Sequence, residues 1–233
     1  MLEIAAALGM GALVAAGYNT MSPTSQLYGR TFTGKSAPSR ELALTYDDGP
    51  NDPCTFQLLE LFEKHGVKAT FFMIGRYVDH RPDIAEAVAA AGHVIANHTY
   101  THPNLILQSK WQVWDEIQRC ERALDDAVGQ QHTRLFRPPF GGRRPVTLRL
   151  VNRAGFKTIM WNVTGFDWRG LPAETIERNV DSHVQPGSVV LLHDGGHERF
   201  GTDRASTVEA TSHFLRRFLD EGYEFRTIPE MMK

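Results

Sequence analysis

The stretch LALTYDDGPND, from Leu42 to Asp52, decides the fold of this chain. Its apolar first half predicts a β-strand, and this strand ends in two adjacent aspartates, Asp47 and Asp48. The Gly49-Pro50 pair that follows turns the chain sharply away. Neighbouring carboxylates repel each other, so something must keep both of them ionised or give them different tasks.

Outward from this strand, short apolar runs alternate with helix-like segments, several of which end at glycines. The run KATFFMI, at 68–74, is continuous and apolar, which is typical of a strand buried on both faces. The predicted strands are 42–47, 68–74, 93–97, 134–137, 157–163, 188–193 and 224–228, and the predicted helices are 55–65, 82–91, 110–128, 146–154, 172–184 and 204–221. Such alternation requires a parallel sheet, either closed as a barrel or open and doubly wound.

The composition suits one globular domain. A chain of 233 residues can form a single α/β domain, and 42% hydrophobic with 22% charged residues is an ordinary balance. The formal net charge of -2 provides no basic field, so no nucleic-acid partner is expected. Cys54 and Cys120 are too few for a disulfide framework or a thiolate zinc site, and we expect buried thiols.

The first residues of the chain allow several interpretations. Residues 4–18 carry no charge, but Glu3 has the wrong sign for the start of a signal peptide. As a helix at about 1.5 Å per residue they would span roughly 22 Å, short of a ~30 Å bilayer core. A marginal membrane anchor, an uncleaved signal and a helix packed on the domain stay open. We expect an envelope-directed segment followed by a polar linker at 19–40, while a cytoplasmic location stays open too.

Unusual polar residues fall at the carboxyl ends of five predicted strands. They are Asp47 with Asp48, His98 with His102, Arg137, Asp167 with Trp168, and His193. Parallel barrels and open α/β sheets build their sites at this end of the sheet. Residues that lie far apart in the sequence are therefore expected to converge on one cleft.

The sequence NHTYTH places His98 and His102 four residues apart. On a helical turn this spacing puts both imidazoles on one face, a common way to hold a metal ion. Two surface histidines in a loop are the alternative, and the spacing alone does not decide. A carboxylate from another strand end would complete a three-ligand site with an open position for water, and the Asp47–Asp48 pair supplies one.

A metal ion would also explain the aspartate pair. Successive side chains of a strand point to opposite sides, so one aspartate can face the metal while its neighbour faces the substrate. A nearby dication lowers the pKa values of both carboxyl groups and removes the cost of placing them together. Taken alone, the sequence DDGP would be an ordinary surface turn.

Two further groups suit the chemistry of such a site. Arg137, at the start of the rigid RPPFGG segment, could orient an ionised carboxylate by a forked hydrogen bond, or be part of a structural ion pair. His193 closes an apolar strand and could act as a general acid oriented by Asp167, or be a buried structural histidine. The other histidines are interpreted as structural: His65, His80, His93, His132, His183, His197 and His213.

Five motifs in this order closely resemble those of the polysaccharide deacetylase family, also called carbohydrate esterase family 4 or the NodB-homology domain. They are TYDDGP (Thr45–Pro50), HTYTH (His98–His102), RPPFG (Arg137–Gly141), the Asp167-Trp168 pair and LLHD (Leu191–Asp194). The resemblance runs from Arg40 to the C-terminus. Each motif is weak alone, and the resemblance rests on the five together.

The resemblance implies a single α/β domain over 40–233 with the fold of a distorted (β/α)7 barrel. The apolar segment and linker at 1–39 lie outside the resemblance. It implies hydrolysis of N-acetyl groups from an acetylated oligo- or polysaccharide, with release of acetate. It also implies a divalent cation, usually Zn²⁺ and otherwise Co²⁺ or Ni²⁺. By motif position, the cation would be bound by Asp48, His98 and His102. Asp47 would be the general base, held by Arg137, and His193 would be the general acid, with its pKa tuned by Asp167. Phe140 would donate its backbone N–H to the oxyanion, and the acetyl pocket would be lined by Trp168 and Leu191.

The sequence departs from the family pattern at three positions. Tyr46 replaces the usual Phe, and Phe140 stands where a Tyr is usual. The change at Tyr46 is small. The change at Phe140 costs little if this residue donates its backbone N–H to the oxyanion, because that N–H does not depend on the side chain. Thr164 stands where many members carry an Asp, which puts any role of that Asp in doubt.

Three other functions stay open at this point. An O-acetyl esterase or small-amide hydrolase could use the same fold. A non-catalytic carbohydrate-binding barrel would be expected to lack a ligand or the base, whereas all of these residues are present. A glycosidase needs two carboxyl groups facing each other across roughly 5–9.5 Å, which adjacent strand residues fit poorly. The polymer also stays open among peptidoglycan, chitin oligomers and an exported exopolysaccharide.

Overall fold

The computed structural model describes residues 10, 14–36 and 40–233. Its centre is an eight-stranded sheet with parallel pairing between neighbouring strands, in the order β5-β4-β3-β2-β1-β7-β6, and β8 pairs with the start of β1. The strands are β1 (Glu41–Gly49), β2 (Thr70–Met73), β3 (Val94–Asn97), β4 (His132–Phe136), β5 (Lys157–Thr158), β6 (Val163–Thr164), β7 (Ser188–His193) and β8 (Glu224–Phe225).

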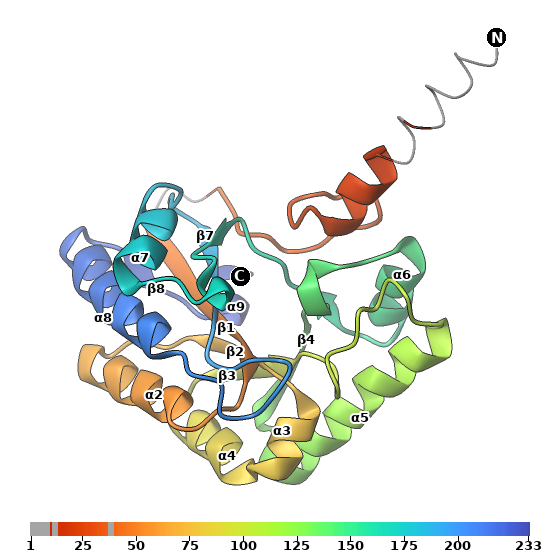
Figure 1. The fold of residues 1–233 in the computed structure, drawn as a ribbon, viewed down its shortest axis with the longest axis horizontal. Helices are drawn as coiled ribbons and strands as arrows, with labels where there is room; N and C mark the ends of the chain where they lie inside the picture. The colour runs from red at the N-terminus through yellow and green to blue at the C-terminus, as the bar shows by residue number, and fades with distance from the viewer. Residues whose placement is uncertain (1–9, 11–13, 37–39) are drawn as a thin grey trace.

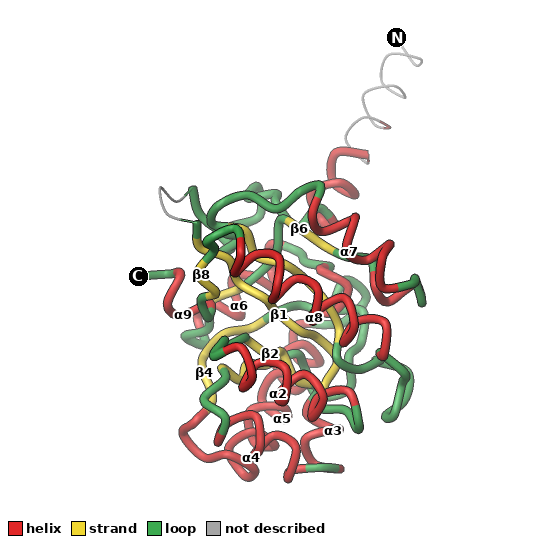
Figure 2. The backbone as a smooth tube through the Cα atoms, turned by 90° about the vertical axis from the view of Figure 1, so that its left-hand side faces the viewer, coloured by secondary structure: helices red, strands yellow, loops and turns green. Residues whose placement is uncertain are grey.

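Helices surround this curled sheet (Figure 1). They are α2 (Cys54–His65), α3 (Gly75–His80), α4 (Pro82–Ala90), α5 (Lys110–Val128), α6 (Pro145–Arg153), α7 (Ala173–Asp181), α8 (Ala205–Asp220) and α9 (Ile228–Met231), with 3-10 turns η1 (Gly129–Gln131), η2 (Pro139–Gly141) and η3 (Asp167–Arg169). Along the outside, α2 packs beside α8, α8 beside α7, and α3 and α4 beside α5. Figure 2 shows α2 and α8 in front of the strands. The predicted single α/β domain with a distorted (β/α)7 barrel is confirmed.

Local signals explain where the helices begin and end. Ser109 caps α5 through a capping box, in which its hydroxyl accepts from Gln112 N–H and the Gln112 side chain accepts from Ser109 N–H. Gly66 ends α2 in the left-handed conformation, at φ 65°, and its N–H bonds to the carbonyls of the last turn. The observed bounds of both helices therefore lie within one residue of the predicted ones.

The alternation of β1 divides the core into two layers. Leu44 and Tyr46 point outward into the cluster between the sheet and the helices. Ala43 points inward, into a smaller cluster inside the barrel that contains Phe72. Asp47 lies two pleats beyond Ala43 on this inner side, so the strand carries a carboxylate into the mouth of the barrel.

The predicted strand 157–163 divides into two short strands. β5 pairs with β4 and β6 pairs with β7, so the segment still joins the two ends of the sheet. Between them, the carbonyls of Ile159 and Met160 accept hydrogen bonds from the buried guanidinium of Arg137, each at 3.3 Å. Phe32 pairs with Ile159 at the same place. The strand breaks because these carbonyls serve a side chain instead of a sheet ladder.

The C-terminal strand is also shorter than predicted. β8 ends at Phe225, and α9 begins at Ile228, inside the predicted strand 224–228. Thr227 forms a capping box with Glu230, whose carboxylate accepts from both the N–H and the hydroxyl of Thr227 at 2.8 and 2.7 Å. This local cap starts a helix where the apolar pattern alone had suggested a strand.

The described part of the predicted linker, 19–36, packs on the barrel. Phe32 forms a parallel bridge with Ile159, and Gly34 an antiparallel bridge with Ser188. These contacts cover the place where β5 gives way to β6. The linker was predicted as a polar connection, and the structure adds contacts that its composition did not indicate.

The apolar segment predicted at 4–18 falls largely on residues 1–9 and 11–13, which lie outside the described residues. Residues 14–21 form a helix. Among the helices that the structure describes, none combines the length and the apolar character needed to cross a bilayer.

Close backbone contact between the ends of β1 and β7 generates a stability prediction. A Cβ on Gly195 would lie 2.2 Å from the Asp48 carbonyl oxygen, so Gly195→Ala should lower the free energy of unfolding by at least about 1–3 kcal/mol, the usual cost of overpacking. Urea denaturation measures it. Gly17→Ala is the matched control, because its Cβ would meet no atom of the described residues within 4 Å. Equal stability of both variants would contradict this packing.

Candidate active site

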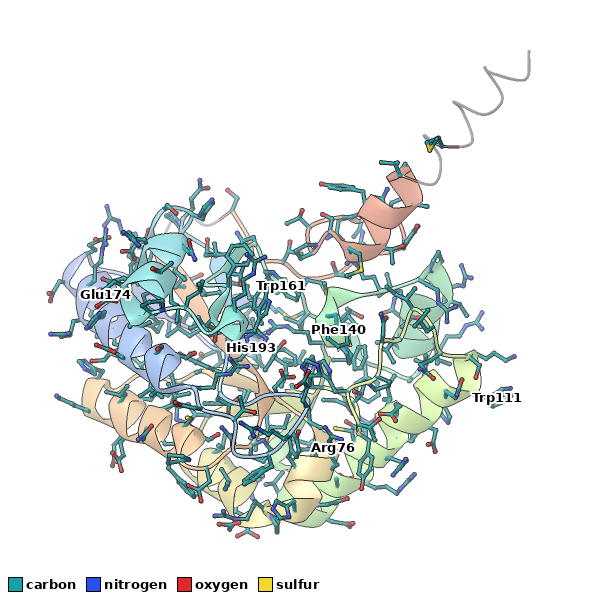
Figure 3. All side chains as sticks on the ribbon, in the orientation of Figure 1. Arg76, Trp111, Phe140, Trp161, Glu174 and His193 are labelled. Atoms are coloured by element: carbon teal, nitrogen blue, oxygen red, sulfur yellow. The ribbon has the colours of Figure 1, made fainter. Side chains whose placement is uncertain are left out.

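The predicted site residues gather around one pocket of about 620 Å³ at the carboxyl ends of the strands. The pocket is lined by Asp47, Asp48, His98, His102, Phe140, Trp168, Leu191 and His193, among others. Figure 3 shows His193, Trp161 and Phe140 near the centre of the molecule, whereas Trp111 lies at its edge. Arg137 and Asp167 lie buried behind this wall.

Asp48, His98 and His102 form a group that could hold a metal ion. One ligand atom from each lies within 4.8 Å of the others, and all three residues are buried. Asp48 Oδ1 lies 3.2 Å from His102 Nε2 and 3.6 Å from His98 Nε2. His98 Nδ1 lies 2.8 Å from the carbonyl of Arg137, which can only accept, so its Nε2 is free to bind.

The charge state of this group also suits a cation. The buried Asp48 Oδ1 has no hydrogen-bond partner among the described residues. Burial alone would raise the pKa of Asp48, but His197 and the other imidazoles of the pocket hold it well below its ordinary value. Burial lowers the pKa of His102 to about 3. At neutral pH the group therefore offers a carboxylate and a neutral imidazole, the forms that bind a divalent metal ion.

Both aspartates face the same pocket because the strand does not continue regularly. The register between β1 and β2 shifts between Asp47 and Gly49, and Asp48 has a φ of 71°. Simple alternation would have sent the two carboxylates to opposite faces of the sheet, as the sequence had suggested. The bulge instead turns Asp48 beside Asp47, and the two differ in their partners rather than in their face.

Non-glycine residues in the left-handed region cluster around the pocket. Besides Asp48 they are Thr99 (φ 69°), His102 (φ 62°), Phe140 (φ 57°) and Phe166 (φ 55°). Such conformations cost of order 1–3 kcal/mol each and persist where the surroundings enforce them. Four of the five lie within the predicted motifs and Phe166 directly precedes the Asp167-Trp168 pair, which locates the strain at the site.

Asp47 is held by a fully buried arginine. Arg137 Nη1 donates to Asp47 Oδ1 at 2.6 Å and to Thr45 Oγ1 at 2.9 Å. The guanidinium also stacks on Phe72, with 4.0 Å from its carbon to the ring centroid. Asp47 Oδ2 remains on the pocket side, 3.6 Å from His98 Nε2. The carboxylate is therefore oriented on one oxygen and open on the other.

His193 and Asp167 form a second pair. His193 Nδ1 lies 2.9 Å from Asp167 Oδ1, and its backbone N–H donates to Oδ2 at 2.7 Å. Thr207 donates to the same Oδ2 at 2.9 Å. Burial by itself would lower the pKa of His193, but Asp167 and the two strand-end aspartates raise it to about 9. The imidazole is therefore protonated at neutral pH, and its Nε2 is left for another partner.

Glu116, on α5, supports the histidine loop from behind. Its carboxylate accepts from Tyr100 N–H at 3.0 Å, from Thr101 N–H at 2.7 Å and from Thr101 Oγ1 at 2.7 Å. These residues lie between His98 and His102, so the carboxylate fixes the turn that brings both imidazoles together. Nothing in the sequence near Glu116 marks this role, because its partners lie about fifteen residues earlier.

His197 lies at the pocket although the sequence analysis interpreted it as structural. Its ring stacks on His102 with 4.6 Å between centroids and packs edge-on against Phe140 at 5.1 Å. Trp161 and Arg204 also line the pocket and were not predicted. The position of His197 just after the strand that ends in His193 was the available signal.

The fold is an α/β barrel, and its site contains a carboxylate and two imidazoles that could hold a divalent cation. Beside this group lie two buried pairs, Asp47 with Arg137 and His193 with Asp167. The family model described as polysaccharide deacetylase matches residues 34–159. The chain belongs to this family.

Similar proteins carry names from the same family. The chain is 37% identical over 204 residues to a chitooligosaccharide deacetylase of Bradyrhizobium, covering 85% of this chain and 93% of the relative. A solved peptidoglycan N-acetylglucosamine deacetylase is 33% identical, with a TM-score of 0.80 and coverage of 86% and 92%. A Bacillus anthracis pseudoenzyme of carbohydrate esterase family 4 is 26% identical, also with a TM-score of 0.80, and covers 94% and 81%.

The contacts of Glu116 generate a prediction about metal binding. Glu116→Ala leaves the N–H groups of Tyr100 and Thr101 without their acceptor. Affinity for Zn²⁺ as the probe cation should fall about 10–100-fold, the usual effect of losing a residue that orients the metal ligands through hydrogen bonds. Glu116→Gln keeps one acceptor and should fall less. Competition with a chromogenic chelator measures the affinity.

Asp115→Asn is the matched control, because Asp115 lies on the same helix, is 61% exposed and only approaches Arg119 at 3.8 Å. Its zinc affinity should equal that of the native chain. If Glu116→Ala also binds zinc like the native chain, the carboxylate does not support the histidine loop.

Proposed function

We propose that this chain is a metal-dependent hydrolase that removes N-acetyl groups from oligo- or polysaccharides containing N-acetylglucosamine, with release of acetate. The observation that carries the proposal is the convergence, in one pocket, of a cation-binding group, an oriented carboxylate and a protonated imidazole. Amide hydrolysis needs these three functions: an activated water, a base for its proton and an acid for the leaving nitrogen. The names of the similar proteins support the substrate class.

Asp48, His98 and His102 would hold the cation, for which we propose Zn²⁺, with Co²⁺ or Ni²⁺ as alternatives. One carboxylate and two imidazoles are a common zinc donor set, with a position left open. A bound zinc ion would lower the pKa of water from 15.7 toward about 7 and polarise the acetyl carbonyl.

Asp47 is the proposed general base. Arg137 holds its Oδ1 and leaves Oδ2 toward the pocket, so one oxygen can accept a proton without loss of the other contact. His193 is the proposed general acid, because Asp167 keeps it protonated and fixes its ring through Nδ1. The two groups would act on opposite sides of the same acetamide, one removing a proton and one donating it.

The oxyanion would be stabilised by the Phe140 backbone. Among the described residues, the Phe140 N–H donates no hydrogen bond, while the next two N–H groups bond to Pro138 and Pro139 carbonyls. A free N–H at the pocket wall can serve a developing negative charge, and losing one such donor costs about 2.7–4 kcal/mol in comparable acyl transfer. Trp168 and Leu191 would enclose the acetyl methyl group.

Two alternatives act through the same pocket. An O-acetyl esterase or a small-amide hydrolase would cleave p-nitrophenyl acetate or small acetamides but not N-acetylglucosamine oligomers, so comparing these substrates separates them. A non-catalytic barrel has a precedent in the similar Bacillus anthracis pseudoenzyme. Against it, this chain carries the complete set of Asp47, Asp48, His98, His102 and His193.

An envelope location is part of the proposal, supported by the peptidoglycan deacetylase among the similar proteins. Fractionation of cells tests it, and recovery only with cytosolic markers would oppose it. Association with a membrane through residues 4–18 stays a prediction. The division of the chain at residue 40 also stays a proposal, since the described residues before it pack on the barrel.

The two aspartates should respond differently to amide substitution. Asp47→Asn keeps its shape but is a poor proton acceptor, so it should bind zinc normally and release no acetate from N-acetylglucosamine oligomers at any zinc concentration. Asp48→Asn removes the carboxylate ligand, so it should bind zinc weakly and regain part of its activity in excess zinc. Zinc content and acetate release are measured across a zinc titration.

Asp52→Asn is the control for this pair, because Asp52 lies in the same loop but bonds to Arg81 at 2.8 Å. It should behave like the native chain. If zinc restores Asp47→Asn and not Asp48→Asn, the assigned roles are reversed, and identical behaviour would mean that both carboxylates bind the cation.

The raised pKa of His193 sets the alkaline limit of activity. Its value of about 9 in the folded chain lies above the ordinary 6.5, so the proton persists through neutral pH and leaves as the pH rises through about 9. kcat should fall over that range. His193→Ala should lower kcat by roughly 10²–10⁴ and lose this alkaline limb, with zinc content unchanged. His213→Ala, which removes a histidine paired with Glu177 on the outside, should leave the profile intact. An unchanged profile in His193→Ala would assign the acid elsewhere.

A further inference from the structure

Arg143 is a buried cation that follows the RPPFG motif and has no part in the proposed chemistry. It is 1% exposed, and burial lowers its pKa, an effect that among the described residues is opposed by the Tyr28 phenol and by no carboxylate. Its guanidinium donates to backbone carbonyls instead: Nη1 to Gly141 at 3.1 Å, and Nη2 to Ser22 at 2.6 Å and Ser25 at 2.8 Å. A buried charge is costly unless it is well hydrogen-bonded, so these carbonyls must hold Arg143 firmly in place.

Two of these carbonyls belong to the segment that follows the N-terminal helix. The backbone N–H of Arg143 also donates to the Thr20 carbonyl at 3.1 Å, within the last turn of the helix at 14–21. The last carbonyls of a helix have no partner in the helix and carry partial negative charge. The backbone N–H of Arg143 supplies such a partner to the Thr20 carbonyl, while its guanidinium bonds just beyond the helix, to Ser22 and Ser25. This end of the helix is seen above the green segment that leads into α6 in Figure 1.

The remaining acceptor of the Arg143 guanidinium is the carbonyl of Gly141, a residue that lines the pocket. Phe140 and Gly141 are consecutive residues in the left-handed region, at φ 57° and 68°. Only glycine fits at position 141, because a Cβ there would lie 2.8 Å from the Trp161 ring. On the pocket side, the Phe140 ring packs against His102 at 4.7 Å. The Arg143–Gly141 bond therefore holds a strained turn from the side away from the site.

We propose that Arg143 is a positioning residue that ties the Phe140–Gly141 turn, and with it the Phe140 N–H, to residues 20–25. The inference rests on the proposed function, because the N–H serves the oxyanion there. If Arg143 has this role, residues 20–25 help to position the active site and are more than a connection to the barrel. None of the described residues 14–36 lines the pocket, so the effect passes through the turn.

Arg144 is the matched control. It is the next residue, it is also an arginine, and its guanidinium also donates to a backbone carbonyl, that of Gln108. Gln108 lies before α5 and away from the pocket lining. A loss caused merely by removing an arginine from this loop should therefore appear equally in both positions.

The experiment uses the full chain with Arg143→Met, Arg143→Lys and Arg144→Met. Acetate release from N-acetylglucosamine oligomers gives kcat and KM, and the zinc content normalises kcat. For Arg143→Met we expect kcat to fall about 100-fold, as for a small misplacement of a catalytic group, with KM and zinc content unchanged. Arg143→Lys keeps the charge and one donor and should fall less, and it also serves if Arg143→Met does not fold. Arg144→Met should match the native chain.

Hydrogen exchange supplies a measurement that does not depend on activity. The N–H groups of Gly141 and Gly142 bond within the turn, so the peptide covering 138–142 should exchange faster in Arg143→Met, while the strand peptides stay protected. Equal kcat losses in Arg143→Met and Arg144→Met, or unchanged exchange at 138–142, would overturn the proposal. If the native chain released no acetate from any saccharide, the proposed function would fail, and the exchange measurement would still decide whether Arg143 holds the turn.

Discussion

The buried ion pair between Arg137 and Asp47 is the interaction on which the rest of the site depends. Arg137 is 0% exposed and links the end of β4 to the end of β1 across the inside of the barrel. Its other donors reach the carbonyls of Ile159 and Met160, where β5 stops. Truncating one partner of such a pair typically costs about 3–5 kcal/mol, because the other charge stays buried and uncompensated. One side chain therefore orients a carboxylate and shapes the sheet around it.

Four carboxyl groups crowd this end of the barrel, and each is stabilised differently. Asp47 pairs with Arg137, and Asp48 lies beside the imidazoles of the pocket. Asp167 is hydrogen-bonded to His193 and Thr207. Burial raises the pKa of Asp194 to about 7, against a hydrogen bond from Thr55 at 2.5 Å, so this carboxyl group can be neutral near physiological pH. Different partners let neighbouring acids take different tasks, which is the requirement that the adjacent aspartates of the sequence had raised.

Likeness of fold alone does not decide activity in this family, since a pseudoenzyme resembles this chain as closely in TM-score as an N-acetylglucosamine deacetylase does. Function lies in the side chains that a fold presents. For this chain the argument for hydrolysis therefore rests on the pocket residues and their contacts. The turn at Phe140 and the loop between His98 and His102 each place a residue at the pocket wall. Glu116 holds the loop, and the segment at 20–25 is proposed to hold the turn through Arg143.

The sequence by itself determined the parallel sheet, most helix bounds and the motifs at the strand ends, because apolar period, caps and strand order are local properties. Only the tertiary structure decided how these parts meet. The break after Thr158 depends on carbonyls that bond to Arg137, and the orientation of Asp48 depends on a bulge rather than on strand alternation. Glu116, His197 and Arg143 acquire their places from partners far away in the chain, and no local pattern records such partners. The type of a residue sets the chemistry that it can perform, whereas its neighbours, charge state and backbone strain depend on the folded barrel.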